Sequence, residues 1–552
     1  MSNLNPHDNS KRMSTDEKVL DDERRETVTS PRGHGRIIQH DEKQIKHGDV
    51  ALAVLGDQRV TLTPEEDRAI RIKTDKTILA LLVWLYFLQI LDKTVIGTST
   101  AFGLRKDANL VGNDYSNMTA IGYYGQLAAL LFTTTLIVKL PLRQYATVIV
   151  FCWGCSLLGM AFAHNFAGLA ATRFLLGFFE ASCLPLFTIV ITNFYKRSEQ
   201  PFRALFYGTN GIATIFSSFL GWALSFATST TLHKYLSNHL LTTALMTIVT
   251  VPFIWWKLDS NVATARFLTP EERVKGIERL RANNSGTGST DFKWHHMWEA
   301  LYDAKTWFWL AMSFFINAGA SVTSTFGPLL LSSFGFTPRI LTLLNMPFGA
   351  LQTIIILGAS WSAYRFSNKA IPMFFINLPV IAALAVLYTN GRGVEDRGAN
   401  LGAYYLLSFL FAGNPLILAW LGANTAGSTK KAFNITGFQV MLSVGNIVSP
   451  HLFQAGDAPN YKPALRSILA FFVANATTVV LTILYLTFLN KRHERSRVAE
   501  GKPAKIKDLS MAHARSKAGD AESQVTVVDE RLGTQAFLDL TDMENNEFIY
   551  VH

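Results

Sequence analysis

Charged residues and cysteines are scarce in this chain of 552 residues. Only 17% of the residues are charged, whereas 49% are hydrophobic and 12% are aromatic. Soluble proteins average about 25% charged residues, so the composition excludes an ordinary soluble enzyme and indicates an integral membrane protein. The three cysteines, Cys152, Cys155 and Cys183, lie in apolar stretches and form no disulfide framework. Cys152 and Cys155 have the spacing of a redox pair, but thiolates are disfavoured there, and we interpret both as packing residues.

Sequence signals for catalysis and for cofactors are also missing. A membrane enzyme needs a nucleophile beside a base, or a cluster of metal ligands, and neither is found in the sequence. His295 and His296 have no partners at ligand spacing. The run Gly208-Thr209-Asn210-Gly211 lacks the Lys-Ser/Thr pair and the preceding strand of a phosphate loop. We therefore predict a protein that is not an enzyme and carries no cofactor and no metal.

The net charge of +10 does not indicate a nucleic-acid partner. Lys and Arg cluster at the ends of apolar blocks and in the tails, which is typical of a protein embedded in a lipid bilayer. The first 50 residues are polar and charged, so no cleavable signal peptide is predicted. The first span is expected to serve as the insertion signal.

Long apolar blocks dominate the rest of the chain. Most of them reach or exceed the ~20 residues that a helix needs to cross a bilayer. We predict an all-α membrane protein with twelve spans, which are Ile78–Thr98, Tyr115–Val138, Tyr145–Ala163, Phe166–Thr192, Phe202–Thr228, Tyr235–Lys257, Thr306–Leu331, Ile340–Tyr364, Ala370–Thr389, Gly402–Ala423, Ala432–Phe453 and Leu465–Leu489.

A polar segment separates the first six spans from the last six. The predicted parts are a cytosolic tail (1–77), a six-helix half (78–257), a cytosolic linker (258–305), a second six-helix half (306–489) and a second cytosolic tail (490–552), with both tails mostly disordered. A short helix is expected just before the membrane, because Thr63-Pro64-Glu65-Glu66 supplies an N-cap, a first-turn proline and early acids. Two six-helix halves joined by a linker are the plan of the twelve-helix major facilitator fold.

The orientation in the membrane is predicted from the distribution of Lys and Arg. The short loops on the two sides carry nearly equal numbers, nine against eight, and do not decide. The linker and the segment after the last span carry the excess, which consists of Arg266, Arg273, Lys275, Arg279, Arg281, Lys293, Lys491, Arg492, Arg495 and Arg497. The positive-inside rule then places both termini in the cytosol, and we expect the plasma membrane as the location.

Two opposite charges lie in the fourth apolar block. Arg173 and Glu180 are seven residues apart on one hydrophobic helix. A charge buried in the membrane costs from ~3 to over ~10 kcal/mol, so residues of this kind are usually functional. Seven residues are close to two helical turns, so the two side chains share a face, with ~10 Å of axial rise between them. This pattern indicates an anion site and a titratable carboxylate on one wall of a cavity.

Several stretches of the chain resemble one family. They are Leu91-Asp92-Lys93-Thr94, Leu140-Pro141-Leu142, Arg173-Phe174-Leu175-Leu176-Gly177-Phe178-Phe179-Glu180-Ala181, Phe194-Tyr195-Lys196-Arg197-Ser198-Glu199-Gln200-Pro201, Trp420-Leu421-Gly422-Ala423-Asn424-Thr425-Ala426-Gly427 and Ala458-Pro459-Asn460-Tyr461. The similarity runs from about Thr63 to Lys491 in the expected order. In these stretches the chain resembles a major facilitator transporter of the anion:cation symporter family, in the fungal allantoate permease-like branch.

The resemblance implies a transporter that imports a small organic anion together with protons. The implied substrates are allantoate-, nicotinate-, pantothenate- or dipeptide-like carboxylates. In related symporters an acidic–basic pair in the first span and an Arg-x6-Glu motif in the fourth carry coupling and binding. By this resemblance Lys93 and Arg173 are expected to bind substrate, and Asp92 and Glu180 to carry protons. Lys93 replaces the arginine that bacterial and animal relatives prefer, and lysine offers a point charge rather than a planar fork.

The depth of these charges follows from counting residues along straight helices. The count places Asp92, Lys93 and Arg173 in the outer half of the membrane and Glu180 on the inner side. The alternative is that the four residues pair with one another as structural ion pairs. Lys93 points ~100° away from Asp92 and would then face a neighbouring helix.

Neutral polar residues supply further candidates. Tyr123 and Tyr124 in the second span can donate hydroxyl hydrogen bonds to an anion, with ordinary packing as the alternative. Asn446 matches a family position that contacts substrate in relatives. The remaining intramembrane amides either bind substrate or join helices, and they are Asn210, Asn317, Asn345 and Asn414.

Two other functions stay open on the same fold. A proton-coupled antiporter that exports a small molecule usually carries a Gly-x3-Gly-Pro run in the fifth span, whereas this chain has Gly211 to Ile215 without proline. A non-transporting nutrient receptor differs from a transporter only in measured flux.

Overall fold

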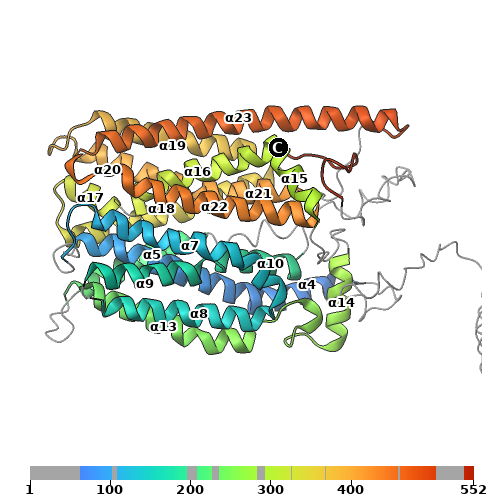
Figure 1. Ribbon diagram of the computed structural model, residues 1–552, viewed down its shortest axis with the longest axis horizontal. Helices are drawn as coiled ribbons and strands as arrows, with labels where there is room; N and C mark the ends of the chain where they lie inside the picture. Colours follow the sequence, from blue (N-terminus) through green and yellow to red (C-terminus); the bar gives the residue numbers. More distant parts are fainter. Residues whose placement is uncertain are drawn as a thin grey trace, which may run out of the picture. The chain divides into compact units, whose positions relative to one another are not determined.

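The computed structural model describes residues 62–101, 109–163, 165–195, 208–226, 235–281, 293–324, 326–366, 368–457, 460–504 and 540–552. All of them fall within one compact unit, Asp49–His552. Within these ranges every regular element is a helix, which confirms the predicted all-α class. Figure 1 shows most of the long helices running side by side in this unit.

The first described helix begins where the sequence predicts. In α4 (Pro64–Thr74), Thr63 Oγ1 accepts the Glu66 backbone N–H at 3.3 Å, and the Thr63 N–H donates to the Glu66 carboxylate at 3.1 Å. This reciprocal pair is a capping box. The chain then continues through one π-helical segment, η1 (Asp75–Leu79), into the first span, α5 (Ala80–Ala101).

The first six-helix half packs as three helix pairs, α7 on α9, α8 on α13 and α5 on α12. The fourth span is split directly after Glu180, where α9 ends, and α10 begins at Cys183. The bounds of the helices in this half after α5 are α7 (Asp114–Lys139), α8 (Leu142–Ala161), α9 (Phe166–Glu180), α10 (Cys183–Phe194), α12 (Thr209–Leu224) and α13 (Tyr235–Lys257).

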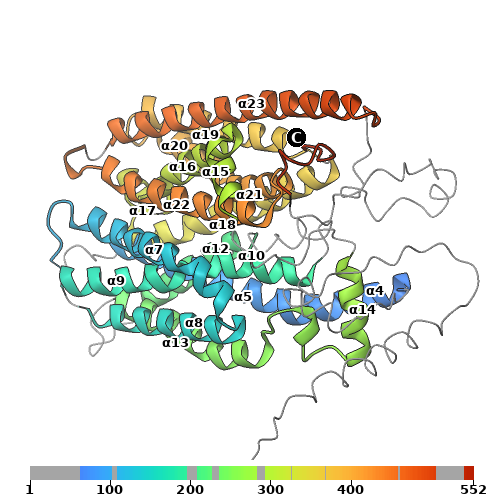
Figure 2. The same cartoon turned by 45° about the vertical axis from the view of Figure 1, so that its right-hand side comes forward.

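The linker is partly helical and its first helix is held on the first half by ion pairs. It contains η3 (Val262–Thr264), α14 (Pro270–Arg281) and α15 (Trp294–Tyr302). Arg279 pairs with Asp67 of α4 at 2.8 Å, and Lys275 pairs with Glu66 at 2.6 Å. We call the end of the molecule that carries α4, α14 and α15 the linker end, and the opposite end the far end (Figure 1). Figure 2 shows α4 and α14 beside each other at the linker end.

The second six-helix half is built around α16, which packs on both α22 and α23. Its elements are α16 (Ala304–Ser324), α17 (Gly327–Ser333), α18 (Pro338–Arg365), α19 (Ala370–Thr389), α20 (Arg397–Leu406), η4 (Leu407–Ala412), α21 (Gly413–Ala423), α22 (Ser428–Leu452), η5 (Ala455–Asp457) and α23 (Lys462–Ala499).

Within the described residues, each of the twelve predicted spans overlaps one helix or consecutive helices, and only residues 208–226 of the fifth span are described. Spans four, seven and ten are each broken into two or three pieces. By length and apolar composition alone, eight of the described helices qualify as membrane spans. The remaining spans are α7, α12, α16 and α22. Of these, α7 and α22 carry polar side chains toward each other, since Ser443 Oγ of α22 donates to Gln126 Oε1 of α7 at 3.2 Å. α12 is described over only 16 residues, fewer than a helix needs to cross the bilayer.

The two halves meet mainly through α12 on α18 and α7 on α22. Gly211 and Gly349 permit a close crossing of α12 and α18, because a Cβ added at Gly211 would lie 2.1 Å from the Gly349 carbonyl oxygen. At the far end the halves touch again. The rings of Tyr115 and Phe326 stand edge to face with centroids 6.0 Å apart, and Arg339 lies over the ring of Phe226 at 4.7 Å.

The last residues of the chain pack into the second half at the linker end. The indole N–H of Trp420 donates to the Val551 carbonyl at 2.9 Å, Asn424 exchanges hydrogen bonds with the Val551 backbone, and Tyr550 is 2% exposed. We call residues 540–552 the C-terminal segment. The tail was predicted to be mostly disordered, and that prediction did not anticipate this contact. Residues 505–539 of the tail lie outside the described residues.

A buried charge cluster anchors the C-terminal segment. Asp542 pairs with Lys305 of α16 and with Lys430 of α22, and both lysines also pair with Asp303. Burial alone would raise the pKa of Asp542, but the two ammonium groups outweigh burial and lower that pKa. Lys430 is desolvated as well, yet Asp542 and Asp303 raise its pKa above the usual value. Asp542 and Lys430 therefore stay charged at neutral pH.

Candidate functional site

Glycines on α7 and α9 bring the predicted charged residues together. A Cβ added at Gly177 of α9 would lie 1.8 Å from the Gly122 carbonyl oxygen of α7, so no other residue fits without a shift. A Cβ added at Gly122 would lie 3.0 Å from Arg173 Nε. The small residues thus allow the two backbones to approach and leave the space that the Arg173 side chain occupies.

Arg173 is a buried cation with unused hydrogen-bonding capacity. The residue is 6% exposed. Its Nε and Nη1 atoms have no hydrogen-bond partner among the described residues. A guanidinium presents five donors in a planar fork. An unsatisfied buried donor is costly, and its presence in a native fold points to a ligand.

Lys93 and Glu180 form an ion pair beside Arg173. Their Nζ and Oε1 atoms are 2.5 Å apart, with side-chain exposures of 27% and 4%. The residue count along straight helices had placed Lys93 and Glu180 at different depths, and the structure places them in contact. The reason is that α5 and α9 pack in a bundle, so counting residues along each helix separately does not give the relative heights of side chains on two helices.

Asp92 belongs to the same electrostatic cluster but faces another neighbour. It is fully buried, and its Oδ2 accepts the indole N–H of Trp153 from α8 at 2.6 Å. Its charge interacts with those of Glu180, Lys93 and Arg173. The second oxygen, Oδ1, has no hydrogen-bond partner among the described residues.

A small cavity lies at the centre of these groups. It is lined by Lys93, Gly122, Tyr123, Gln126, Arg173, Gly177 and Glu180. Its volume open to the centre of a water molecule is about 10 Å³, roughly what one water requires. With Asp92 counted, two cations face two carboxylates, so the cluster is formally neutral when all four are ionised.

The predicted site residues separate into two groups. Lys93, Tyr123, Arg173 and Glu180 line the cavity. Tyr124 lies on another face of α7 and is 48% exposed. Asn446 is buried on α22, where its Nδ2 donates to the Leu442 carbonyl at 2.9 Å, and it is not part of the lining.

Two residues near the cavity were missed by the sequence reasoning. Gln126 lines the cavity and also accepts from Ser443 Oγ of the other half. Trp153 is the donor to Asp92. Gln126 follows Tyr123 by three residues and so shares its helix face, which is a signal that was available. Nothing in the sequence distinguishes Trp153 from the other aromatic residues of the spans.

The other candidate amides form hydrogen bonds with polar side chains on neighbouring helices. Asn317 and Asn414 exchange hydrogen bonds at 3.0 Å, and Asn345 accepts from the Tyr404 hydroxyl at 2.8 Å. Asn210 accepts from Gln352 Nε2 across the halves at 2.8 Å. These pairings match the role of polar residues that join membrane helices.

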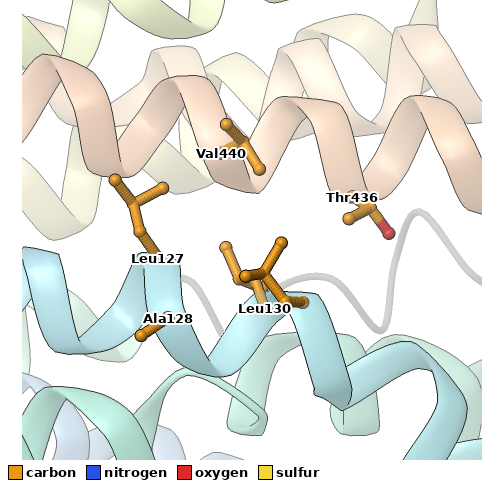
Figure 3. A pocket seen from close by; sticks show the side chains of 6 residues that line it. Leu127, Ala128, Leu130, Thr436 and Val440 are labelled. Atoms are coloured by element: carbon orange, nitrogen blue, oxygen red, sulfur yellow. The ribbon is translucent and has the colours of Figure 1, made fainter.

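A larger, apolar cavity lies between the halves, toward the linker end from the charged cluster. Its volume is about 300 Å³ and it is lined by Leu127, Ala128, Leu130, Leu131, Thr436 and Val440. Figure 3 shows that the lining side chains come from α7 and α22, with Leu127 and Leu130 reaching toward the facing helix. The halves are therefore separated here while they touch at the far end.

Comparisons with known proteins agree with this architecture. The sequence profile of the Major Facilitator Superfamily matches residues 82–450. An uncharacterized transporter of Schizosaccharomyces pombe is 29% identical over 91% of this chain and 90% of its own length. The allantoate permease of Saccharomyces cerevisiae is 27% identical over 95% and 93%, and a thiamine pathway transporter of the same yeast is 28% identical over 87% and 86%.

Solved structures show the same fold. The nucleoside transporter NupG superposes with a TM-score of 0.53 at 13% identity, covering 73% of this chain and 99% of its own. The xylose transporter XylE from E. coli, in a partially occluded inward-open conformation, gives a TM-score of 0.52 at 12% identity over 75% and 98%.

Proposed function

The chain belongs to the Major Facilitator Superfamily of transporters, and we propose that it is a proton-coupled symporter that imports a small organic anion. The proposed substrate is a carboxylate, in the size range of allantoate, nicotinate, pantothenate or a dipeptide. The yeast relative that carries the name allantoate permease supports this class. The observation that carries the proposal is the buried Arg173 guanidinium beside the cavity, whose Nε and Nη1 have no hydrogen-bond partner among the residues that the structure describes.

Binding begins with the anion at Arg173. A carboxylate that accepts from Nε and one terminal nitrogen forms a charge-assisted, bidentate contact. The cavity as it stands holds about one water, so the substrate needs the surrounding helices to separate. Tyr123 and Gln126 supply neutral donors around the same space.

The proton enters through charge balance. The cluster of Lys93, Arg173, Asp92 and Glu180 is formally neutral, and an added anion makes it negative in a medium of low dielectric. A proton on Glu180 restores neutrality and breaks the pair with Lys93, whose ammonium is then free to face the substrate. Binding of the anion and binding of the proton thus favour each other, and by linkage the effect is mutual. Asp92 offers a second site for a proton.

Transport follows from alternating contact between the halves. The contacts of Tyr115 with Phe326 and of Arg339 with Phe226 hold the two halves together at the far end. The apolar cavity between the halves lies toward the linker end. We assign the far end to the outside and the linker end to the cytosol, in the plasma membrane, because of the basic residues of the linker. Opening the far end and closing the apolar cavity would expose the cluster to the outside.

Uptake measurements test the proposed function. In a permease-deficient yeast host, candidate carboxylates are supplied in radiolabelled form at several external pH values. We expect uptake that rises as the external pH falls from neutral and that collapses with a protonophore. Arg173→Lys keeps the charge but loses the fork, so uptake should fall at least about tenfold with surface expression retained. Glu180→Gln should bind and exchange substrate without accumulating it.

Two outcomes would contradict the proposal. Wild-type uptake by Arg173→Lys would remove the anion site, and pH-driven accumulation by Glu180→Gln would remove the coupling role. The orientation is tested separately with Val394→Cys and Val498→Cys, two exposed positions at opposite ends. An impermeant thiol reagent should label Val394→Cys in intact cells and Val498→Cys only after permeabilisation.

A further inference from the structure

A group of possible metal ligands lies at the linker end, remote in sequence from one another. His295 and His296 come from the first turn of α15, and Glu544 comes from the C-terminal segment. One ligand atom of each residue lies within 4.8 Å of the other two. No third ligand lies near the histidine pair in the sequence, because that ligand, Glu544, comes from the C-terminal segment.

We propose that His295, His296 and Glu544 bind a divalent transition-metal ion of the zinc class, and that this ion fastens the C-terminal segment to the linker helix α15. Two imidazoles and one carboxylate are a ligand set that suits zinc, with water in the fourth position. Calcium and magnesium prefer oxygen ligands and do not fit a pair of imidazoles.

The distances suit an ion better than a direct hydrogen bond. His295 Nε2 and Glu544 Oε1 are 3.8 Å apart, beyond hydrogen-bonding range. Two ligands at ~2.1 Å from a tetrahedral zinc ion are about 3.4 Å apart. The side chains of His295 and Glu544 are 61% and 38% exposed, so they are free to make the remaining adjustment, and water has access to the ion.

The surrounding contacts hold two of the three ligands in place. The Thr541 backbone N–H donates to Glu544 Oε2 at 3.0 Å, which leaves Oε1 on the side of His295. His296 is fully buried, and Gly427 makes room for its ring, since a Cβ there would lie 3.2 Å from two ring atoms. Gly427 has a φ of +84°, a conformation that favours glycine. Such supporting contacts orient ligands in known metal sites.

The site joins two parts of the chain that other contacts already bring together. Asp542, two residues before Glu544, sits between Lys305 and Lys430, and Thr541 Oγ1 donates to Glu299 of α15 at 2.7 Å. The segment therefore arrives at α15 already positioned, and a metal would add a second attachment at its exposed edge.

Metal binding is measured on the full-length chain in lipid nanodiscs after treatment with EDTA. Zn²⁺ is titrated in competition with a chromogenic chelator. We expect one tight site per chain, weakened at least about tenfold by His295→Ala and by Glu544→Gln. Both residues are exposed, so these variants should fold. His451→Ala is the matched control, because His451 is an exposed histidine on α22 with a backbone partner of its own.

Attachment of the segment is measured by thiol labelling. Met543→Cys is introduced into a chain in which Cys152, Cys155 and Cys183 are replaced by Ser. Zn²⁺ should slow the labelling at least threefold relative to the EDTA-treated protein, Mg²⁺ should not, and Glu544→Gln should abolish the effect of Zn²⁺.

Three results would overturn the proposal. In the first, the wild-type chain shows no Zn²⁺ site. In the second, His295→Ala and Glu544→Gln bind Zn²⁺ as tightly as wild type, so that the ion lies elsewhere. In the third, labelling of Met543→Cys does not respond to Zn²⁺, which means that no ion fastens the segment. None of these results bears on transport, so the proposed function stands or falls separately.

Discussion

Replacing Asp542 by Asn should detach the C-terminal segment and destabilise the second half. The carboxylate of Asp542 pairs with Lys305 and with Lys430, the latter at 3.0 Å, and accepts the hydroxyl of Tyr550 at 2.9 Å. All four of these groups are nearly inaccessible to solvent. Asn has the same shape but no charge, so the two ammonium groups lose a partner while the packing is kept.

The magnitude follows from the charges that remain. Breaking a buried ion pair by removing one partner costs about 3–5 kcal/mol. Asp303 still pairs with both lysines, and Glu299 still faces Lys430 at 2.7 Å. Because these carboxylates compensate in part, we expect the lower end, about 3 kcal/mol. That is a large fraction of the typical stability of a folded domain.

The assay is thermal unfolding of the purified chain in detergent, followed by tryptophan fluorescence. Asp542→Asn should unfold several degrees below wild type, whereas Glu395→Gln, which neutralises an exposed carboxylate, should unfold with wild type. Combining Asp542→Asn with Lys305→Met should recover part of the loss, because the less compensated ammonium is removed. If Asp542→Asn matches the control, or if the double variant is less stable than the single one, the reasoning about this cluster is refuted.

Three further predictions concern packing and pH. Gly177→Ala should abolish uptake, because the new methyl group would lie 1.8 Å from the Gly122 oxygen. Gly358→Ala should transport normally in the same assay, because no atom of the described residues lies within 4 Å of the new methyl group. Trp153→Phe removes the hydrogen-bond donor to Asp92 and should cost about 1–3 kcal/mol in thermal unfolding. Trp309→Phe should cost less, because the Trp309 indole nitrogen has no hydrogen-bond partner within the described ranges. Burial lowers the pKa of His493, so the docked segment is stabilised at pH values above the ordinary histidine pKa. This contribution is lost as the pH falls below that value. Labelling at Met543→Cys should therefore speed up between pH 7.5 and roughly pH 5.5.

The twelve spans and the four charged residues were accessible to prediction because each depends on a local property. Apolar blocks of sufficient length mark spans regardless of how these pack, and the cost of burying Arg173 or Glu180 marks them as functional candidates before any neighbour is known. Pairings between spans were not accessible in this way. That Lys93 contacts Glu180, and that Trp153 donates to Asp92, depends on how α5, α8 and α9 pack.

The C-terminal segment shows the limit of composition most clearly. It was counted as part of a mostly disordered tail, yet Asp542 finds Lys305 across 237 positions of sequence. The carboxylate matches two buried lysines, and the apolar side chains of Met543, Phe548 and Tyr550 pack with the core. Composition averages over a window and is blind to one residue that fits a charged cleft.

The molecule contains two buried charge clusters, and the difference between them indicates which one is functional. In one, Lys305 and Lys430 pair with Asp303 and Asp542, and Glu299 is a third carboxylate at Lys430. In that cluster every charged side chain has its partners within the described residues. In the other, two nitrogens of Arg173 and one oxygen of Asp92 have no hydrogen-bond partner in the part of the chain that the structure describes. A closed cluster gains nothing from a ligand, whereas an open one is stabilised by an anion at the guanidinium and a proton at a carboxylate, and these are the two species that the proposed symport carries together.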